Sequence, residues 1–135
     1  MQTDIPVAEP FDLSSNVVGL DRSTGAACFM VRDRPGPPVR LDGRTVGVNL
    51  VGGESPHGGE MHPDGDELLY VIDGRMRVLL ELDGGERVVE VDAGQAVVVP
   101  QGTWHLILPG EPAHMLNITP GPTGKHRPIP TDTDA

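Results

Sequence analysis

The stretch that decides the fold runs from Gly53 to Gly74 and reads GESPHGGEMHPDGDELLYVIDG. Its second half is a short apolar run, Leu68–Ile72, which ends at Asp73-Gly74. Asp-Gly favours the tight turn of a β-hairpin, because the centre of that turn needs positive φ. The first half is a glycine-rich loop that concentrates histidine and acidic side chains. The stretch therefore predicts a polar, ligand-rich loop that leads into a hairpin.

Outward from this hairpin, short β-prone runs alternate with tight turns along most of the chain. The 18 glycines and 14 prolines favour many short strands over helices, and no window shows a sustained helical apolar period. Such spacing is typical of a sandwich or small barrel, here with about eight mostly antiparallel strands. The expected strands are Ala26–Val31, Arg44–Val51, Leu68–Ile72, Arg75–Leu82, Arg87–Val91, Ala96–Val99, Trp104–Leu108 and His114–Thr119.

The 135 residues are enough for one domain with a real core. We expect this β-domain to span residues 26–120, with an N-terminal arm at 1–25 and an extended C-terminal tail at 121–135. The segment Arg34–Pro38 contains three prolines, which lack amide donors, so it should be irregular. Exposed sheet edges and the N-terminal arm suggest a homodimer, since small β-domains often cover their edges by pairing.

Charge and composition exclude several classes of partner. The net charge is −10, which would repel a nucleic-acid backbone, and no basic stripe offsets it. No apolar run approaches the roughly 20 residues that span a bilayer, and residues 1–10 lack the features of a signal peptide. The lone cysteine, Cys28, lies in an apolar run and is expected to be a buried thiol. These features predict a soluble, cytoplasmic protein that binds neither nucleic acid nor a membrane.

Four side chains can converge on one metal ion. Glu60 and His62 are two residues apart, so in a strand both would leave the same face. The turn residues 63–66 break the strand, so Glu67 can turn back toward them. His105 follows the turn Pro100-Gln101-Gly102 in another strand. Convergence of the four would surround one cation with two imidazole nitrogens and two carboxylates.

The spacing of these residues resembles the two motifs of the cupin superfamily. The first motif is matched at His62, Glu67 and Gly74, with Gly53 one residue further upstream than usual. The second is matched at every position up to its histidine, as Gly94-x5-Pro100-x-Gly102-x2-His105. The resemblance implies an all-β, double-stranded β-helix or jelly-roll barrel in two sheets. It also implies that His62, Glu67 and His105 are metal ligands.

The sequence departs from the family pattern at two positions. The usual second motif ends in Asn four residues after its histidine, where this chain has Pro109, a change expected to affect only the turn. The usual His-x-His pair of the first motif is replaced by Glu60 and His62. Glu60 can ligate through oxygen or lie out in the loop, and His57 is an alternative occupant of that place.

We expect one divalent metal per chain. Two carboxylates would bring a site with a divalent ion to zero net charge, which favours Fe²⁺ or Mn²⁺ and leaves Zn²⁺ and Ni²⁺ open. His57 and His114 are candidates for an acid–base role. Three further side chains are candidates for the walls of a substrate pocket: Tyr70, Trp104 and Asn117. His126, flanked by basic residues, is expected at the surface.

Two functions remain open at the level of sequence. The first is a metal-dependent enzyme, a dioxygenase or else an isomerase or lyase, that acts on a small polar or organic-acid molecule. The second is a non-catalytic small-molecule-binding module or sensor, because the resemblance covers both enzymes and binding proteins and a fold does not determine a function. Turnover that depends on added metal would distinguish them.

Overall fold

The computed structural model describes residues 2–30 and 40–130, which form strands and connecting loops without a helix in those two ranges. The strands are β1 (Gln2–Asp4), β2 (Val17–Asp21), β3 (Ala27–Met30), β4 (Gly43–Val51), β5 (Glu60–Met61), β6 (Glu67–Asp73), β7 (Arg75–Leu82), β8 (Gly85–Asp92), β9 (Ala96–Val99), β10 (His105–Ile107), β11 (Ala113–Gly121) and β12 (Lys125–His126). Within the described ranges no helix is long and apolar enough to cross a membrane.

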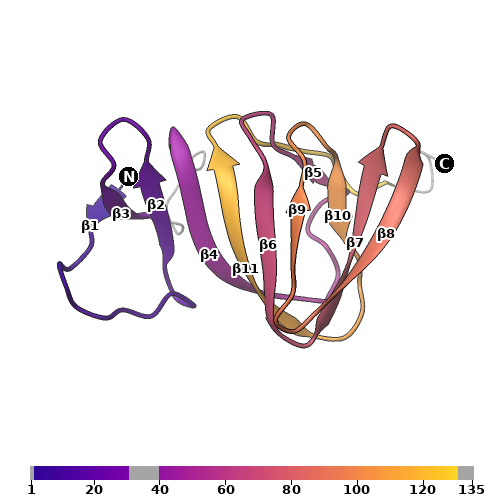
Figure 1. Cartoon of the computed structure of the whole chain (residues 1–135), viewed down its shortest axis with the longest axis horizontal. Coiled ribbons are helices and arrows are strands. Elements are labelled where there is room, and N and C mark those ends of the chain that lie inside the picture. Colours follow the sequence, from indigo (N-terminus) through magenta and orange to yellow (C-terminus); the bar gives the residue numbers. More distant parts are fainter. Residues whose placement is uncertain (1, 31–39, 131–135) are drawn as a thin grey trace.

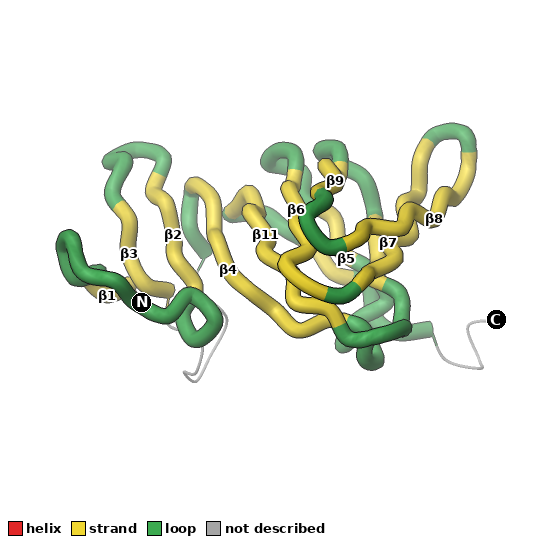
Figure 2. Tube along the Cα trace, turned by 60° about the horizontal axis from the view of Figure 1, so that its bottom comes forward, coloured by secondary structure: helices red, strands yellow, loops and turns green. Residues whose placement is uncertain are grey.

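The strands form two antiparallel sheets. The larger sheet has seven strands in the order β1-β3-β2-β4-β11-β6-β9, and the smaller has five in the order β12-β5-β10-β7-β8. Figure 1 shows β4, β11, β6 and β9 side by side, with β1, β2 and β3 extending the larger sheet to one side. Figure 2 shows the strands connected by loops, and the chain passes between the two sheets several times, for example from β6 to β7 and from β8 to β9. This arrangement confirms the predicted all-β jelly roll.

The predicted hairpin of β7 and β8 is confirmed, but the hairpin expected across Asp73-Gly74 is wrong, because β6 pairs with β11 and β9 in the larger sheet and β7 with β10 and β8 in the smaller one. Strand β7 has the predicted bounds and pairs with β8 along its whole length, from Arg75 opposite Asp92 to Leu82 opposite Gly85. Strand β9 also has the predicted bounds, and β6 is one residue longer at each end than predicted. Gly74 has a φ of 81°, as the Asp-Gly turn requires.

The described chain has twelve strands, four more than predicted. Two of these, β5 and β12, are only two residues long and pair with each other, so no local period marks them. Strands β1 and β2 lie within residues 1–25, where an arm was expected, and β2 pairs with both β3 and β4. The segment Arg34–Pro38 and residues 131–135 of the tail lie outside the described residues.

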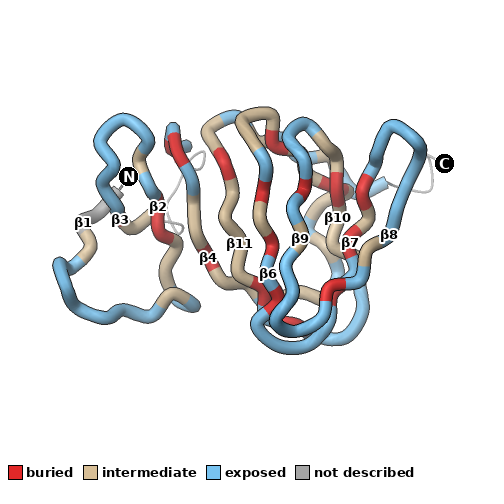
Figure 3. The backbone as a smooth tube through the Cα atoms, viewed as in Figure 1, coloured by how far each residue is buried: buried red, intermediate tan, exposed pale blue. Residues whose placement is uncertain are grey.

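The core lies between the two sheets and follows the alternation of their strands. Met76, Val78 and Leu80 alternate along β7 and are buried, while their neighbours are more exposed. From the facing sheet, Leu69 and Val71 of β6 are at most 2% exposed. Figure 3 shows these buried segments gathered where the sheets face each other. The core therefore lies beside the first residues of β6 and β10, Glu67 and His105, where the polar site begins.

Candidate metal centre

Three elements of the fold bring the predicted ligands together. Glu60 in β5 is the direct register partner of His105 in β10, so their side chains leave the same face of the smaller sheet. His62 follows β5 immediately, and the turn after it returns the chain to Glu67 at the first residue of β6. This is the geometry expected from the sequence, in which Glu60 and His62 share a face and Glu67 turns back toward them.

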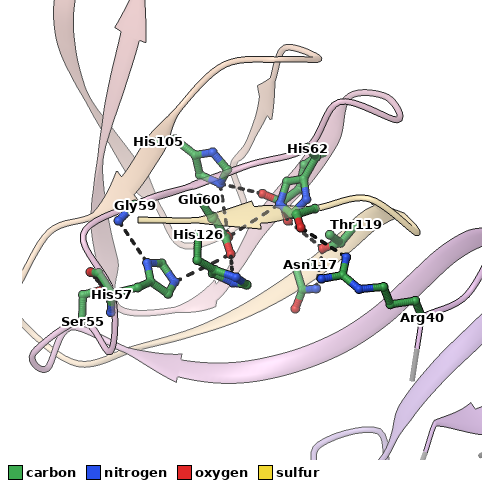
Figure 4. Close-up of polar contacts among 12 residues, drawn as sticks. Arg40, Ser55, His57, Gly59, Glu60, His62, His105, Asn117, Thr119 and His126 are labelled. Carbon is green, nitrogen blue, oxygen red and sulfur yellow. Dashed lines mark hydrogen bonds and ion pairs between the residues drawn. The ribbon is translucent and has the colours of Figure 1, made fainter. Parts of the chain in front are cut away.

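Glu60, His62 and His105 point toward one another (Figure 4), and Glu67 lies within contact distance of both imidazoles. His105 Nε2 lies 2.9 Å from Glu67 Oε1 and 3.3 Å from Glu60 Oε1. His62 Nε2 lies 3.3 Å from Glu67 Oε2 and 3.8 Å from Glu60 Oε1. One donor atom from each of the four residues lies within 4.8 Å of the others. Such a cluster of two imidazoles and two carboxylates matches the donor set expected from the sequence.

The donor atoms fit a metal ion because they are buried without hydrogen-bond partners. Glu67 and His105 are each 2% exposed and His62 is 8% exposed. Nε2 of both imidazoles and Oε1 of Glu67 face one another as ion pairs and have no hydrogen-bond partner outside the cluster. Buried polar atoms are normally hydrogen-bonded, so donor atoms that meet only each other form a place for a ligand. A cation at their centre would satisfy all of them together.

Neighbouring groups orient the side chains of His105 and Glu67. His105 Nδ1 lies 3.2 Å from the Thr103 carbonyl oxygen, an acceptor that keeps the proton on Nδ1 and leaves Nε2 free to ligate. Thr119 donates its hydroxyl to Glu67 Oε2 at 2.6 Å. Asn117 in turn donates to the Thr119 hydroxyl at 2.8 Å. Asn117, a predicted pocket residue, therefore supports the carboxylate of Glu67 through Thr119.

The charges of the four groups are mutually stabilised in the metal-free protein. Burial by itself lowers the pKa of both imidazoles, but contacts with Glu60 and Glu67 outweigh it and raise the pKa of His62 to about 9 and that of His105 to about 10. Burial by itself raises the pKa of each carboxyl group, but contacts with His105 and His62 hold both pKa values below the usual range. Protons therefore occupy the place that a cation would take.

Two more histidines lie on the outer side of Glu60. Its Oε2 atom is 3.7 Å from His57 Nε2 and 3.5 Å from His126 Nε2, and the two imidazole rings are 4.9 Å apart. The Gly59 amide donates to His57 Nδ1 at 3.1 Å, so in the neutral imidazole the proton sits on Nε2. His57 therefore presents an N–H donor, while Glu60 occupies the ligand position for which His57 was the alternative.

The C-terminal segment covers one side of this centre, which the sequence did not predict. Strand β12 pairs with β5, so His126 lies opposite Glu60 in register. Thr123 donates to the carboxylate of Asp64. A Cβ atom on Gly124 would stand 3.1 Å from His62 Nδ1, so the backbone passes close to that ring. His126, expected at the surface, is 61% exposed at its side chain and still contacts Glu60.

A cavity of about 360 Å³ opens beside the cluster. His57, Glu60 and His105 line it together with Asn49 and Ser55 on the polar side. Its apolar wall comes from side chains of β4, β10 and β11: Val51, Leu106, Ile107 and Met115. The cavity is large enough for a small organic molecule that contacts the cluster.

The other predicted site residues lie elsewhere. Tyr70 pairs with Leu116 on the outward face of the larger sheet, because its register is one residue off that of the buried Leu69 and Val71. Trp104 lies beneath the Arg127 guanidinium, 4.1 Å from ring centroid to Cζ. His114 is half exposed and binds Asp73 at 2.8 Å. These three side chains are therefore placed outside the cluster.

Comparison with known proteins agrees with this architecture. A manganese-containing oxalate decarboxylase of Bacillus subtilis has a similar fold, with 23% sequence identity and a TM-score of 0.52. A second oxalate decarboxylase structure, described for its substrate binding and reaction specificity, gives a TM-score of 0.51 at the same identity. Each match covers 62% of this chain and only 23% of the other chain, so the protein spans about a quarter of these enzymes.

The family assignment comes from the sequence. No curated protein sequence gives a significant match to the chain. The sequence model of the cupin domain, however, matches residues 48–119, a range that contains all four clustered side chains and more than half of the 135 residues. With that match, the two-sheet jelly roll and the likeness to solved cupin enzymes, the chain belongs to the cupin family.

Proposed function

We propose that this protein binds one divalent cation, Mn²⁺ or Fe²⁺, through Glu60, His62, Glu67 and His105, and acts on a small polar or organic-acid molecule in the adjacent cavity. The observation that carries the proposal is the convergence of buried donor atoms without hydrogen-bond partners at the wall of that cavity. Two carboxylates and two neutral imidazoles give a neutral site with a divalent ion, and oxygen donors favour Mn²⁺ and Fe²⁺.

The metal would act as a Lewis acid that polarises a substrate oxygen and stabilises developing negative charge. Glu67 is held in place by Thr119, whose hydroxyl bonds to Oε2. His57 lines the cavity, and burial is the main cause that lowers the pKa of its imidazole, so the ring is neutral at pH 7. Its Nε2 proton is therefore the group best placed to donate to a bound substrate or to a leaving oxygen.

The reaction class that we favour is a metal-dependent lyase or dioxygenase. Oxalate decarboxylases with a similar fold support the lyase, and a cluster that contains two histidines and a carboxylate supports oxygen chemistry at Fe²⁺. Small carboxylates fit the cavity volume and offer oxygen atoms to a metal. Oxalate is therefore the first substrate to test for loss of CO₂, and small organic acids with dissolved O₂ are the second.

Metal analysis tests the site. The purified protein, incubated with Mn²⁺ or Fe²⁺ and desalted, should retain near one ion per chain, and the His62→Ala/His105→Ala double variant should retain almost none. His114→Ala is the matched control. His114 lies outside the cluster and forms an ion pair with Asp73 instead. Equal metal content in all three proteins would overturn the site.

Turnover tests the activity separately. With Mn²⁺ or Fe²⁺ bound, release of CO₂ from oxalate or consumption of O₂ with a small organic acid should depend on the metal and fall in His57→Gln. A protein that binds metal and is stabilised thermally by small acids, yet converts none of them, would be a binding module instead of an enzyme.

A further inference from the structure

A chain of hydrogen bonds runs from the metal cluster to the wall of the adjacent cavity. Thr119 donates its hydroxyl to Glu67 Oε2 at 2.6 Å, and Asn117 donates its amide to the Thr119 hydroxyl at 2.8 Å. Asn49 donates its amide to Asn117 Oδ1 at 2.9 Å. Asn49 also lines the cavity, so the chain connects Glu67 with the surface that a bound molecule would contact.

The direction of each bond in this chain follows from Glu67. A carboxylate that binds a metal is ionised and only accepts hydrogen bonds. The Thr119 hydroxyl must therefore donate to it, which leaves the hydroxyl oxygen to accept from the amide nitrogen of Asn117. The amide oxygen of Asn117 then faces Asn49, so Asn49 turns its own nitrogen toward that oxygen. The carbonyl oxygen of Asn49 is the end of its amide turned away from Asn117, and it brings an acceptor to the cavity wall.

The rest of the wall is also rich in acceptors. The Ser55 hydroxyl donates to the His57 carbonyl oxygen at 2.7 Å, so the hydroxyl oxygen is left to accept. Glu54 adds an exposed carboxylate, and His57 contributes one donor, its Nε2 proton. Among the described residues that line the cavity there is no lysine and no arginine. The wall therefore suits hydroxyl groups, which donate, and holds no fixed cation to pair with a carboxylate.

We propose that the cavity selects a small molecule with at least one hydroxyl group and no more than one carboxylate, and that the hydroxyl donates to Asn49 Oδ1. The inference rests on the proposed function, because the metal of that site would hold the other end of the molecule. It narrows the small polar molecules and organic acids considered above to hydroxy acids and neutral hydroxylated compounds. A second carboxylate at the wall would meet Glu54 and no counter-charge.

Asn49 is the residue that determines this specificity. It lies opposite the buried Met115 in the pairing of β4 with β11, so its side chain faces inward. Its amide is fixed by Asn117, so the acceptor is held in place before a molecule binds. A molecule without the hydroxyl would cover this acceptor and leave it without a partner, which disfavours that molecule.

Three acids of equal length test the preference. Butyrate, 4-hydroxybutyrate and succinate end in a methyl group, a hydroxyl group and a second carboxylate, and their chains are too long for tight chelation of one ion by both ends. Binding to the full chain loaded with Mn²⁺ is measured by calorimetry, and metal content is determined separately. The wild type should bind 4-hydroxybutyrate about tenfold more tightly than either of the other two acids.

Asn49→Leu removes the acceptor at a similar side-chain volume and should reduce the preference for 4-hydroxybutyrate over butyrate to about twofold or less. Ile107→Val is the matched control, because it alters the apolar wall of the same cavity and should keep the preference of the wild type. The preference is a ratio measured within one protein, so a general loss of metal affinity through Thr119 and Glu67 cancels from it. Asn49→Ala replaces Asn49→Leu if the latter does not fold by circular dichroism.

The outcomes separate this inference from the proposed function. A metal-loaded wild type that binds the three acids equally, or binds none of them, would overturn the inference alone. So would a preference for 4-hydroxybutyrate that persists undiminished in the folded Asn49 variant. A wild type that retains neither Mn²⁺ nor Fe²⁺ would instead overturn the proposed function, and the inference with it.

Discussion

At Glu60, the two carboxylate oxygens face different partners. Oε1 lies 3.3 Å from His105 Nε2 in the metal cluster, whereas Oε2 lies 3.5 Å from His126 Nε2 and 3.7 Å from His57 Nε2. The carboxylate thus connects the buried cluster with the histidines outside it. In the usual cupin pattern a histidine stands here, so Glu60 makes the site one charge more negative and its oxygen donor favours a harder cation.

Metal uptake should release protons, because the imidazoles must be neutral to bind a metal. In the metal-free protein the pKa of His62 is about 9 and that of His105 about 10, so both are protonated at pH 7. The apparent affinity for Mn²⁺ should therefore rise with pH from 7 to about 9 and level off above about 10. Calorimetry in buffers of different ionisation enthalpy should show up to two protons released per ion at pH 7.

Glu60→Gln is the control for this behaviour. Removal of the carboxylate lowers the pKa of both imidazoles, so this variant should release fewer protons at pH 7. Its affinity should also level off at a lower pH. An affinity that is independent of pH between 7 and 9 in the wild type would contradict the proposed exchange of protons for metal.

At the scale of elements, two tight turns carry the chain from one sheet to the other, Gly74 between β6 and β7 and Gly94 between β8 and β9, and the two glycines differ in what surrounds them. Gly74 has a φ of 81°, and a Cβ atom there would stand 2.4 Å from the Pro112 carbonyl oxygen. Gly94 has a similar φ of 84°, but nothing lies within 4 Å of its Cβ position. The turn at Gly74 therefore packs closely against the backbone of Pro112 and Ala113, whereas the turn at Gly94 has open space around it.

This difference predicts unequal effects of alanine at the two turns. Gly94→Ala should cost about 1–2 kcal/mol of the free energy of unfolding, which is the usual penalty of the left-handed conformation. Gly74→Ala should cost that amount plus a displacement of the Pro112 backbone, about 3 kcal/mol or more in total. Urea denaturation of the two variants measures both values. Equal losses would show that the close approach at Gly74 relaxes without cost.

At the scale of the whole molecule, two features oppose each other during association. The net charge of −10 repels a second copy, whereas exposed apolar side chains on the larger sheet, Tyr70, Ile72 and Val98, would favour contact. Salt screens the repulsion between exposed charges, with a Debye length of about 10 Å at 0.1 M and about 3 Å at 1 M, and leaves apolar contacts intact. The balance between the two should therefore shift with ionic strength.

The homodimer expected from the sequence should tighten as salt is added. Between about 0.05 and 0.5 M NaCl we expect its dissociation constant to fall by about tenfold, measured by sedimentation velocity. Val88→Glu should show the same trend with a slightly larger slope, since it adds one negative charge per copy. Dissociation with added salt would indicate that ion pairs, and not apolar contacts, hold two copies together.

The sequence by itself determined the strands β6, β7 and β9, the turns that bound them and the identity of the four clustered side chains, but not that β6 and β7 belong to different sheets. These follow from local chemistry: alternation along β7, the Asp-Gly turn at Gly74, and the fixed spacing of His62, Glu67 and His105 within their motifs. Each signal lies within a few residues, so it can be read without knowledge of the fold.

The tertiary structure alone decided which way Glu60 points, that His126 stands beside it, and that Tyr70 faces outward. It also decided that β2 extends the larger sheet and that β12 covers the site. Each of these depends on pairing between residues far apart in the chain, where no local period exists to mark it. The apolar run of β6 shows the limit most clearly, because its sequence predicts a strand, yet only the register determines which side chains face the core and which face outward.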